Sequence, residues 1–174
     1  MYEFIKINNP NIDIAKRDTA FAQCKRFFGD LPLHLELMGN INPEALSDFL
    51  RYNLTLMRNR KFHADFFLFL RLHIAITEGY DYCKYFNTKL LKNRKYNDSQ
   101  IESFVDIENF PLSPSLKLLA KKAMKAVFRS ENFTDEDLQE LYLLDWSIYE
   151  IYEVIEHIAL LEKNRRIIKA FMKK

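Results

Sequence analysis

Cys83 is the residue of this sequence whose type and position say most about possible chemistry. It ends the segment Gly79-Tyr80-Asp81-Tyr82-Cys83, which follows a long apolar stretch. A redox-active dithiol would require a second cysteine three residues earlier, because the two sulfurs must form a reversible disulfide. Such a site would also have a histidine one helical turn later. The chain has Tyr80 and Asn87 at these two positions, so only one of the three groups is present.

The apolar stretch before Cys83 contains groups suited to proton transfer. At 100° per residue, His73, Thr77 and Tyr80 fall on one helical face within about 60°. His73 could therefore serve a pocket near Cys83. The structural alternative is a histidine hydrogen-bonded within the core. The candidate catalytic residues are Cys83, His73 and Tyr80, and the candidate ligand-binding residues are Thr77, Tyr82 and Asn87.

Two interpretations of Cys83 are open. A thiol near a helix N-terminus has a lowered pKa and a raised reactivity, which would permit one-cysteine peroxide chemistry. The sulfenic acid formed would need a second thiol for its reduction, and Cys24 is the other cysteine of the chain. The alternative is an inert cysteine that packs as a small hydrophobic group.

Composition limits the class of protein. The chain has 174 residues, of which 48% are hydrophobic and 14% aromatic, enough for one domain with a core. Three glycines and five prolines are too few for a turn-dense β-protein. A net charge of +2 gives no basic surplus for nucleic-acid binding. We expect one domain over residues 1–174, with residues 1–40 forming an N-terminal extension and helix.

No membrane segment or secretory signal is expected. The most hydrophobic stretch, residues 62–76, carries Asp65, Arg71 and His73, which argues against a membrane span. The first residues show no continuous hydrophobic region, so the sequence predicts a cytoplasmic protein without a structural disulfide.

Neither a metal nor another cofactor is expected. The histidines are widely separated, and the sequence contains no His-x-x-x-His or Glu-x-x-His pattern. His157, with Glu153 and Glu156, is interpreted as part of a solvated or ion-pairing face of the C-terminal helix.

Helix signals run along the chain and predict an all-α fold. Caps and apolar spacing place helices at residues 13–28, from Asn42 onward, 60–78, 81–93, 98–108, 113–129, from Thr134 and from Ser147 to the end. The nearly all-round apolarity of residues 60–78 also suggests a subunit interface.

Three stretches carry a resemblance to a known family. The apolar helix ending in Gly79 to Cys83 resembles a helix that ends in Gly-Cys-x-x-Cys. Leu112-Ser113-Pro114 resembles the start of the helix that commonly follows. Residues 133–138, residues 149–161 and Asn164-Arg165 resemble the C-terminal helices. In this order, the stretches are similar to the carboxymuconolactone decarboxylase and alkyl hydroperoxidase D-like family.

The resemblance implies a multi-helical bundle that assembles as a dimer, trimer or hexamer. In redox-active relatives, two cysteines pass electrons to a peroxidase partner or reduce a peroxide, helped by a histidine and by a glutamate on the preceding helix. Tyr80, Asn87 and Leu68 stand at three of these four positions. One hypothesis is therefore peroxide or thiol redox chemistry through Cys83 alone, with a thiol or peroxidase partner. The other is a catalytically silent member that binds a small ligand or a protein. Acid–base chemistry of the decarboxylase type is a weaker third.

Overall fold

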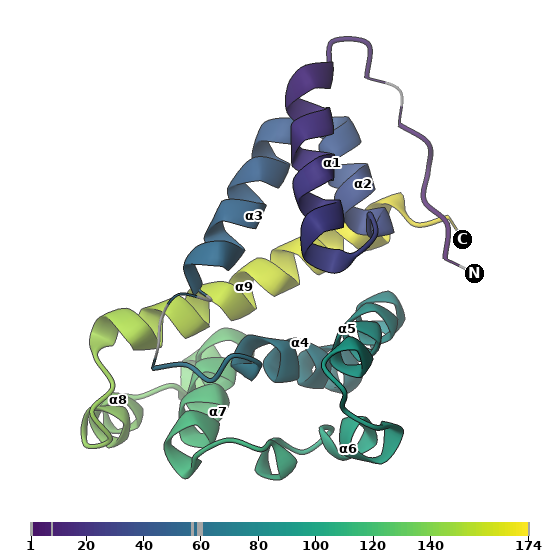
Figure 1. The fold of residues 1–174 in the computed structure, drawn as a ribbon. Helices are drawn as coiled ribbons and strands as arrows, with labels where there is room; N and C mark the ends of the chain where they lie inside the picture. Colours follow the sequence, from purple (N-terminus) through teal and green to yellow (C-terminus); the bar gives the residue numbers. More distant parts are fainter. Residues whose placement is uncertain (1, 8, 57, 59–60, 174) are drawn as a thin grey trace. The chain divides into compact units, whose positions relative to one another are not determined.

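The structure is a computed structural model that describes residues 2–7, 9–56, 58 and 61–173, and it is all-helical (Figure 1). Within these residues, strand-like pairing is confined to an isolated antiparallel bridge between Phe4 and Met172. The predicted all-α fold is confirmed. The chain divides into two compact units, residues 1–60 with 167–174 and residues 61–166. The expectation of one domain over residues 1–174 stays a prediction.

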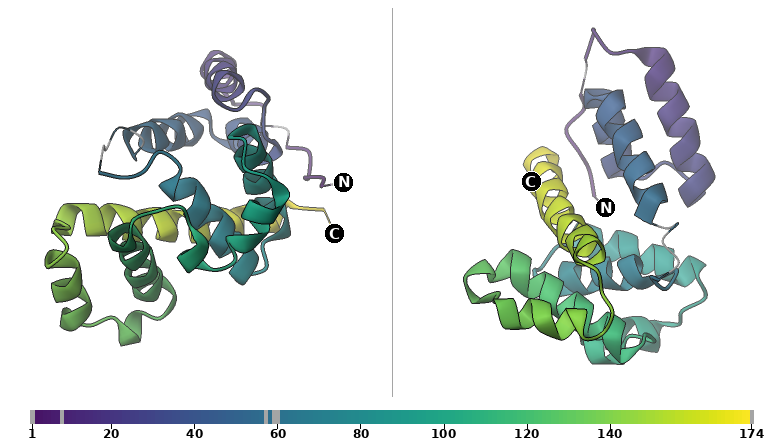
Figure 2. Two further views of the ribbon diagram at one scale, coloured as in Figure 1. Left: turned by 60° about the horizontal axis from the view of Figure 1, so that its bottom comes forward. Right: turned by 90° about the vertical axis from the view of Figure 1, so that its left-hand side faces the viewer.

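The first unit contains helices α1 (Ile14–Phe28), α2 (Leu33–Ile41) and α3 (Pro43–Leu56), which contact one another pairwise (Figures 1 and 2). The Asp13 carboxylate accepts a hydrogen bond from the Lys16 amide at 2.9 Å and caps α1. Gly29 ends this helix with a φ of 81°, which favours glycine. The predicted helix over residues 13–28 is confirmed.

Helix α2 has no counterpart among the predicted helices. It has nine residues and no side-chain cap at its first turn, so it lacks the local signals that identify α1 and α3. Packing holds it in place, because Leu35 is fully buried in a core with Ala20, Cys24, Leu46 and Leu50.

The predicted start of α3 is confirmed. The Asn42 side-chain oxygen accepts hydrogen bonds from the amides of Glu44 at 3.1 Å and Ala45 at 3.0 Å. Pro43, which has no amide hydrogen, occupies the first helical position. The two ends of the chain also meet in this unit, since the Ile5 amide donates to the Phe171 carbonyl at 2.9 Å.

The second unit begins with α4 (Phe66–Thr77) and α5 (Asp81–Asn93), which lie against each other. The predicted range of 60–78 is too long for α4. Residues 61–65 form turns, and Arg60 lies outside the described residues. Helix α6 (Asp98–Ser103) is also shorter than predicted, and a separate 3-10 helix, η1 (Ile107–Asn109), follows it.

Aromatic packing explains the apolarity of α4. Phe69 contacts Phe104 and Tyr96 edge-on, with centroid distances of 4.9 Å and 5.3 Å, and Phe66 and Phe67 are also buried. These partners belong to the same unit. These contacts account for the burial of the α4 aromatic side chains within the chain, and the expected subunit interface stays a prediction.

Helices α7 (Pro114–Phe128), α8 (Asp135–Tyr142) and α9 (Ile148–Phe171) begin where their caps predict. The Ser113 hydroxyl accepts from the Leu116 amide, the Asp137 carboxylate from the Thr134 amide and the Glu150 carboxylate from the Ser147 amide. The last two are capping-box contacts, in which the third helical side chain reaches back to the N-cap amide.

Candidate functional site

Cys83 is the third residue of α5 and is half-buried. Gly79, with a φ of 69°, forms the turn between α4 and α5, and Tyr80 is the N-cap residue of α5. The predicted position of Cys83 near the start of a helix is confirmed. Its sulfur is therefore close to the positive end of a helix dipole, a place that favours a thiolate.

The ionisation of Cys83 is governed by burial. Removal from water raises the pKa of the thiol from 9.0 to about 11, while the positive charge of Arg165 acts in the opposite direction. Burial is the larger effect. The thiol is consequently protonated at neutral pH, which makes it a poor nucleophile.

Tyr80, which stands where a dithiol site would have its first cysteine, belongs to a polar cluster on α9. Its hydroxyl donates to a Glu162 carboxylate oxygen at 2.7 Å, and the Arg165 guanidinium lies 4.1 Å from the centre of its ring. Arg165 and Arg166 both donate to Glu162, at 2.5 Å and 3.1 Å. We call Tyr80, Glu162, Arg165 and Arg166 the Tyr80 cluster.

Charges within the Tyr80 cluster are well matched. The hydrogen bond from Arg165 lowers the pKa of Glu162 to about 2, so this carboxylate is ionised throughout the physiological range. Burial, together with the hydrogen bond to Glu162, raises the pKa of Tyr80, which remains a neutral donor. Tyr80 is thus engaged in a structural network, and its hydroxyl is directed at Glu162.

His73 takes part in a different set of contacts. It is buried, and its Nδ1 lies 3.3 Å from the Phe104 carbonyl oxygen, while its ring meets Phe110 edge-on at 5.9 Å. Burial lowers the pKa of His73, although backbone hydrogen bonds near Phe104 oppose the shift. These contacts match the structural alternative of a hydrogen-bonded core histidine.

The predicted common face of His73, Thr77 and Tyr80 is wrong for Tyr80. Helix α4 ends at Thr77 and the chain turns at Gly79, so the rotation of 100° per residue does not continue to Tyr80. Thr77 is exposed, and its hydroxyl donates to the His73 carbonyl of its own helix at 3.0 Å.

The other candidate binding residues are packed inside the unit. Tyr82 is 6% exposed, as is Asn87. The Asn87 amide group donates to the carbonyl of Cys83 at 2.7 Å, one turn back along α5, and its Oδ1 has no hydrogen-bond partner among the described residues. Leu68, at the position that the resemblance assigns to glutamate, is half-buried in α4.

The expected solvated face at His157, Glu153 and Glu156 is wrong for the first two residues. His157 and Glu153 are buried, at 1% and 7% exposure, whereas Glu156 is exposed. The Nε2 atom of His157 accepts a hydrogen bond from Arg71 at 3.1 Å. Burial first, and the charge of Arg71 second, lower the pKa of His157 well below its ordinary value, so this histidine is neutral and acts as an acceptor.

Cys24 is fully buried in the core of the first unit, and burial raises its pKa to about 11. Neither cysteine forms a disulfide. An enclosed, protonated thiol is unsuited to reduce a sulfenic acid elsewhere.

Glu162 and Arg165 are the site residues that sequence reasoning missed. They lie about one turn apart on α9, a spacing typical of helix ion pairs, but this spacing does not indicate that Tyr80 is their partner.

Among the described residues, no group of three His, Cys, Asp or Glu side chains is arranged to hold a metal ion. In the same part of the chain, none of the helices has both the length and the apolarity needed to cross a membrane.

A solved structure has a similar fold. The crystal structure of an uncharacterized peroxidase-related protein from Silicibacter sp. TM1040 superposes with a TM-score of 0.75 over 94% of this chain and 85% of the other. The two sequences are 16% identical, so the similarity concerns the fold. No family model matches the sequence, and no curated protein matches it. The chain therefore shares an all-helical fold with this solved structure.

Proposed function

We propose that this protein is a divergent member of the alkyl hydroperoxidase D-like family that has lost the two-cysteine cycle and acts by binding another protein. The main support for the proposal is the residue that occupies the position of the first cysteine. Tyr80 stands there, hydrogen-bonded to Glu162 and stacked on Arg165, in a network that holds α5 to α9. A dithiol site has been replaced by a structural contact.

The positions of the histidine and of the second cysteine support the same proposal. Asn87, where relatives have a histidine, bonds back to the Cys83 carbonyl and carries no titratable group. Cys83 itself is kept protonated by burial. Binding of a protein is favoured over binding of a small apolar ligand near Cys83, because Tyr82 and Asn87 are packed into the unit.

A second candidate function is single-cysteine peroxide reduction, favoured by the proximity of Arg165 to Cys83. The Cys83 thiolate would attack a peroxide ROOH, giving Cys83 sulfenic acid and the alcohol ROH. A first external thiol would then form a mixed disulfide with release of water. A second external thiol would release reduced Cys83 and an external disulfide. The external thiol and the peroxide are both required as co-substrates.

Peroxide oxidation of Cys83 in folded and unfolded protein separates the two candidates. Hydrogen peroxide would be added to the native protein and to protein unfolded in urea, both at pH 7.5. A sulfenic-acid trap and peptide mass spectrometry would then follow the loss of the Cys83 thiol. Because the same Cys83 peptide is followed in the native and the unfolded protein, its detection by mass spectrometry is equal in both. The Cys83→Ser variant shows how much oxidation occurs at other sites.

We expect Cys83 to be oxidised more slowly in the folded protein, because its thiolate population is lower there. A rate in the folded protein that exceeds the unfolded rate would refute the proposal and favour the one-cysteine peroxidase. Turnover of peroxide with an external thiol, abolished by Cys83→Ser, would lead to the same conclusion.

A further inference from the structure

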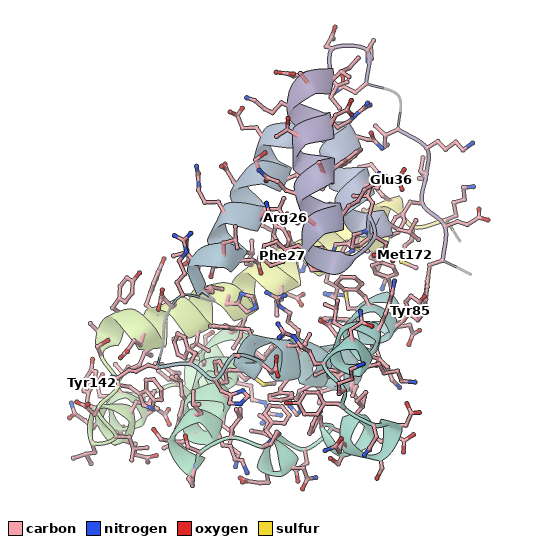
Figure 3. The ribbon with its side chains drawn as sticks, in the orientation of Figure 1. Arg26, Phe27, Glu36, Tyr85, Tyr142 and Met172 are labelled. Carbon is pink, nitrogen blue, oxygen red and sulfur yellow. The ribbon has the colours of Figure 1, made fainter. Side chains whose placement is uncertain are left out.

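An open groove of about 790 Å³ lies in the first unit and is lined by residues of α1 and α3. Figure 3 labels Arg26 and Phe27, two of the lining residues that come from α1. The other lining residues recur every three or four positions from Ser47 to Arg58, so they form one face of α3 that continues into the turn after it. We call this feature the α1–α3 groove. From Ser47 to Leu54 its α3 face rises about 10 Å, or two helical turns.

The walls of the α1–α3 groove present apolar side chains to solvent. Phe27 and Leu54 are 44% and 36% exposed. The Phe27 ring lies 5.8 Å from the ring of Phe28, which packs against the buried core of the unit. Leu50, another lining residue, is 5% exposed and belongs to the same core. A partner that covers Phe27 and Leu54 would therefore bury apolar surface against side chains that the core supports.

The charged residues that line the α1–α3 groove are arginines. Arg26, Arg51 and Arg58 line it, and none of the described lining residues is acidic. Within the described part of the chain, Arg26 and Arg58 form no ion pair, and Arg51 bonds the exposed Asp48 at 2.8 Å. An exposed pair of this kind contributes little to stability, so Arg51 can exchange Asp48 for another carboxylate. The groove thus offers guanidinium groups whose planar geometry is suited to carboxylates.

The shape and lining of the groove favour a helical segment of a protein as its occupant. Sites for small molecules enclose most of the ligand's surface, whereas this groove is open. A single-stranded nucleic acid would use several aromatic side chains for base stacking, and Phe27 is the one aromatic residue among the described lining residues. An amphipathic helix fits the observed pattern, because its apolar anchors are also spaced by three or four residues.

The acidic helix α8 of this chain is not available as that segment. Asp135, Glu136 and Asp137 stand in its first turn. Its Leu141 is fully buried, and the Asp137 carboxylate bonds two lysines of α7. The apolar and acidic groups of α8 are therefore already engaged within their own unit, and the helix that fits the groove belongs to a different protein.

We propose that the α1–α3 groove binds an acidic amphipathic helix of a different protein. Two to three turns of that helix would bury large apolar side chains against Phe27 and Leu54, while its carboxylates meet Arg26, Arg51 and Arg58. This inference rests on the proposed binding role and names the chemistry of the partner.

Selection from a random library of helical peptides tests the proposal without the choice of a partner in advance. Peptides of about 16 residues, long enough to form a helix, would be displayed on phage and selected on the immobilised full-length protein. The enriched peptides would be synthesised, and their dissociation constants measured by fluorescence anisotropy at low and high salt. A single-stranded DNA oligonucleotide would be titrated in the same assay.

Four variants locate the binding. Arg26→Glu and Arg58→Glu each reverse one charge of the groove. Lys25→Glu is their control, because Lys25 is exposed on α1 and lies outside the groove lining, and the change in net charge is the same. Leu54→Ser removes an apolar wall and leaves the charge unchanged. Thermal unfolding followed by circular dichroism checks that each variant is folded.

We expect the enriched peptides to carry glutamate or aspartate beside apolar residues spaced by three or four. Each arginine reversal should raise the dissociation constant at least about tenfold at low salt and less at high salt, and Lys25→Glu should resemble wild type. Leu54→Ser should weaken binding equally at both salt concentrations. In NMR spectra of the wild-type protein, the peptide should shift amide signals of residues 23–27 and 47–58, a readout that needs no variant.

The inference is wrong if no peptide is enriched, if the enriched peptides are not acidic, or if both arginine variants bind them as wild type does. Tighter binding of the oligonucleotide, lost in the same two variants, would assign the groove to nucleic acid instead. Peptides that bind the protein outside the groove would remove the inference and leave the proposed binding role intact. Rapid oxidation of native Cys83 would remove the proposed function whatever the peptides show.

Discussion

The suppressed ionisation of Cys83 gives a quantitative prediction. Burial raises the pKa of this thiol from 9.0 to about 11, a difference of two pH units. The thiolate population at pH 7 is then about 10⁻⁴, compared with about 10⁻² for a thiol with the ordinary value. Since alkylation proceeds through the thiolate, ionisation alone should slow the reaction of Cys83 about 100-fold.

Alkylation by iodoacetamide between pH 7 and pH 10 measures this effect, with peptide mass spectrometry to separate Cys83 from Cys24. The rate for folded protein should increase about tenfold per pH unit up to pH 10 without levelling off. The rate for protein unfolded in guanidinium should level off near pH 9. A plateau below pH 9.5 in the folded protein would show that Arg165 and the helix dipole outweigh burial, and the reasoning would be wrong.

Substitution of Arg165 provides a second test of the two opposing effects on the pKa of Cys83, burial and positive charge. The positive charge of Arg165 lowers the Cys83 pKa, so Arg165→Gln should slow alkylation further. Arg166→Gln is a matched control, because Arg166 also bonds Glu162 but is exposed and does not contribute to the Cys83 shift. Equal effects of the two substitutions would indicate a general loosening of α9.

Three further predictions concern stability. Glu162→Gln should destabilise the protein by about 1–2 kcal/mol at pH 7, measured by urea unfolding, because the variant loses the ion pair with Arg165 but keeps a polar group for Tyr80. The pKa of Glu162 is lowered to about 2, so its contribution is complete above pH 4.5 and disappears as the pH falls towards 2; a difference that persists unchanged at pH 2 would contradict this. Asp137→Asn should cost about 3 kcal/mol, since the buried carboxylate bonds Lys122 at 2.6 Å and Lys125 at 2.7 Å, and a loss below 1 kcal/mol in thermal unfolding would disprove its role. Gly39→Ala should cost about 1–3 kcal/mol, because the added methyl group would collide with the Phe21 ring and approach Leu46 Cδ2 to 2.9 Å; an unchanged unfolding temperature would show that Phe21 moves freely.

Much of the secondary structure could be predicted because its signals are local. Asn42, Ser113 and Ser147 each bond an amide two or three residues away, so a helix start can be recognised from a few neighbouring letters. Helix α2 has no such side chain and depends on Leu35 meeting residues of α1 and α3. Asp65 is the N-cap residue of α4, but its side chain makes no capping hydrogen bond, and the sequence prediction placed the start of this helix at Arg60.

The sequence by itself determined the helical class, the positions of most helices and the place of Cys83 at the start of α5. It also showed that the second cysteine and the histidine of a dithiol site are absent, since this follows from residue identity alone. The tertiary structure decided what Tyr80, His73 and Cys83 do. Tyr80 meets Glu162 across 82 positions of sequence, His73 meets Phe104 across 31, and burial sets the pKa of Cys83. Hydrogen bonding and desolvation of these side chains depend on which distant residues surround them, and no local pattern encodes that arrangement.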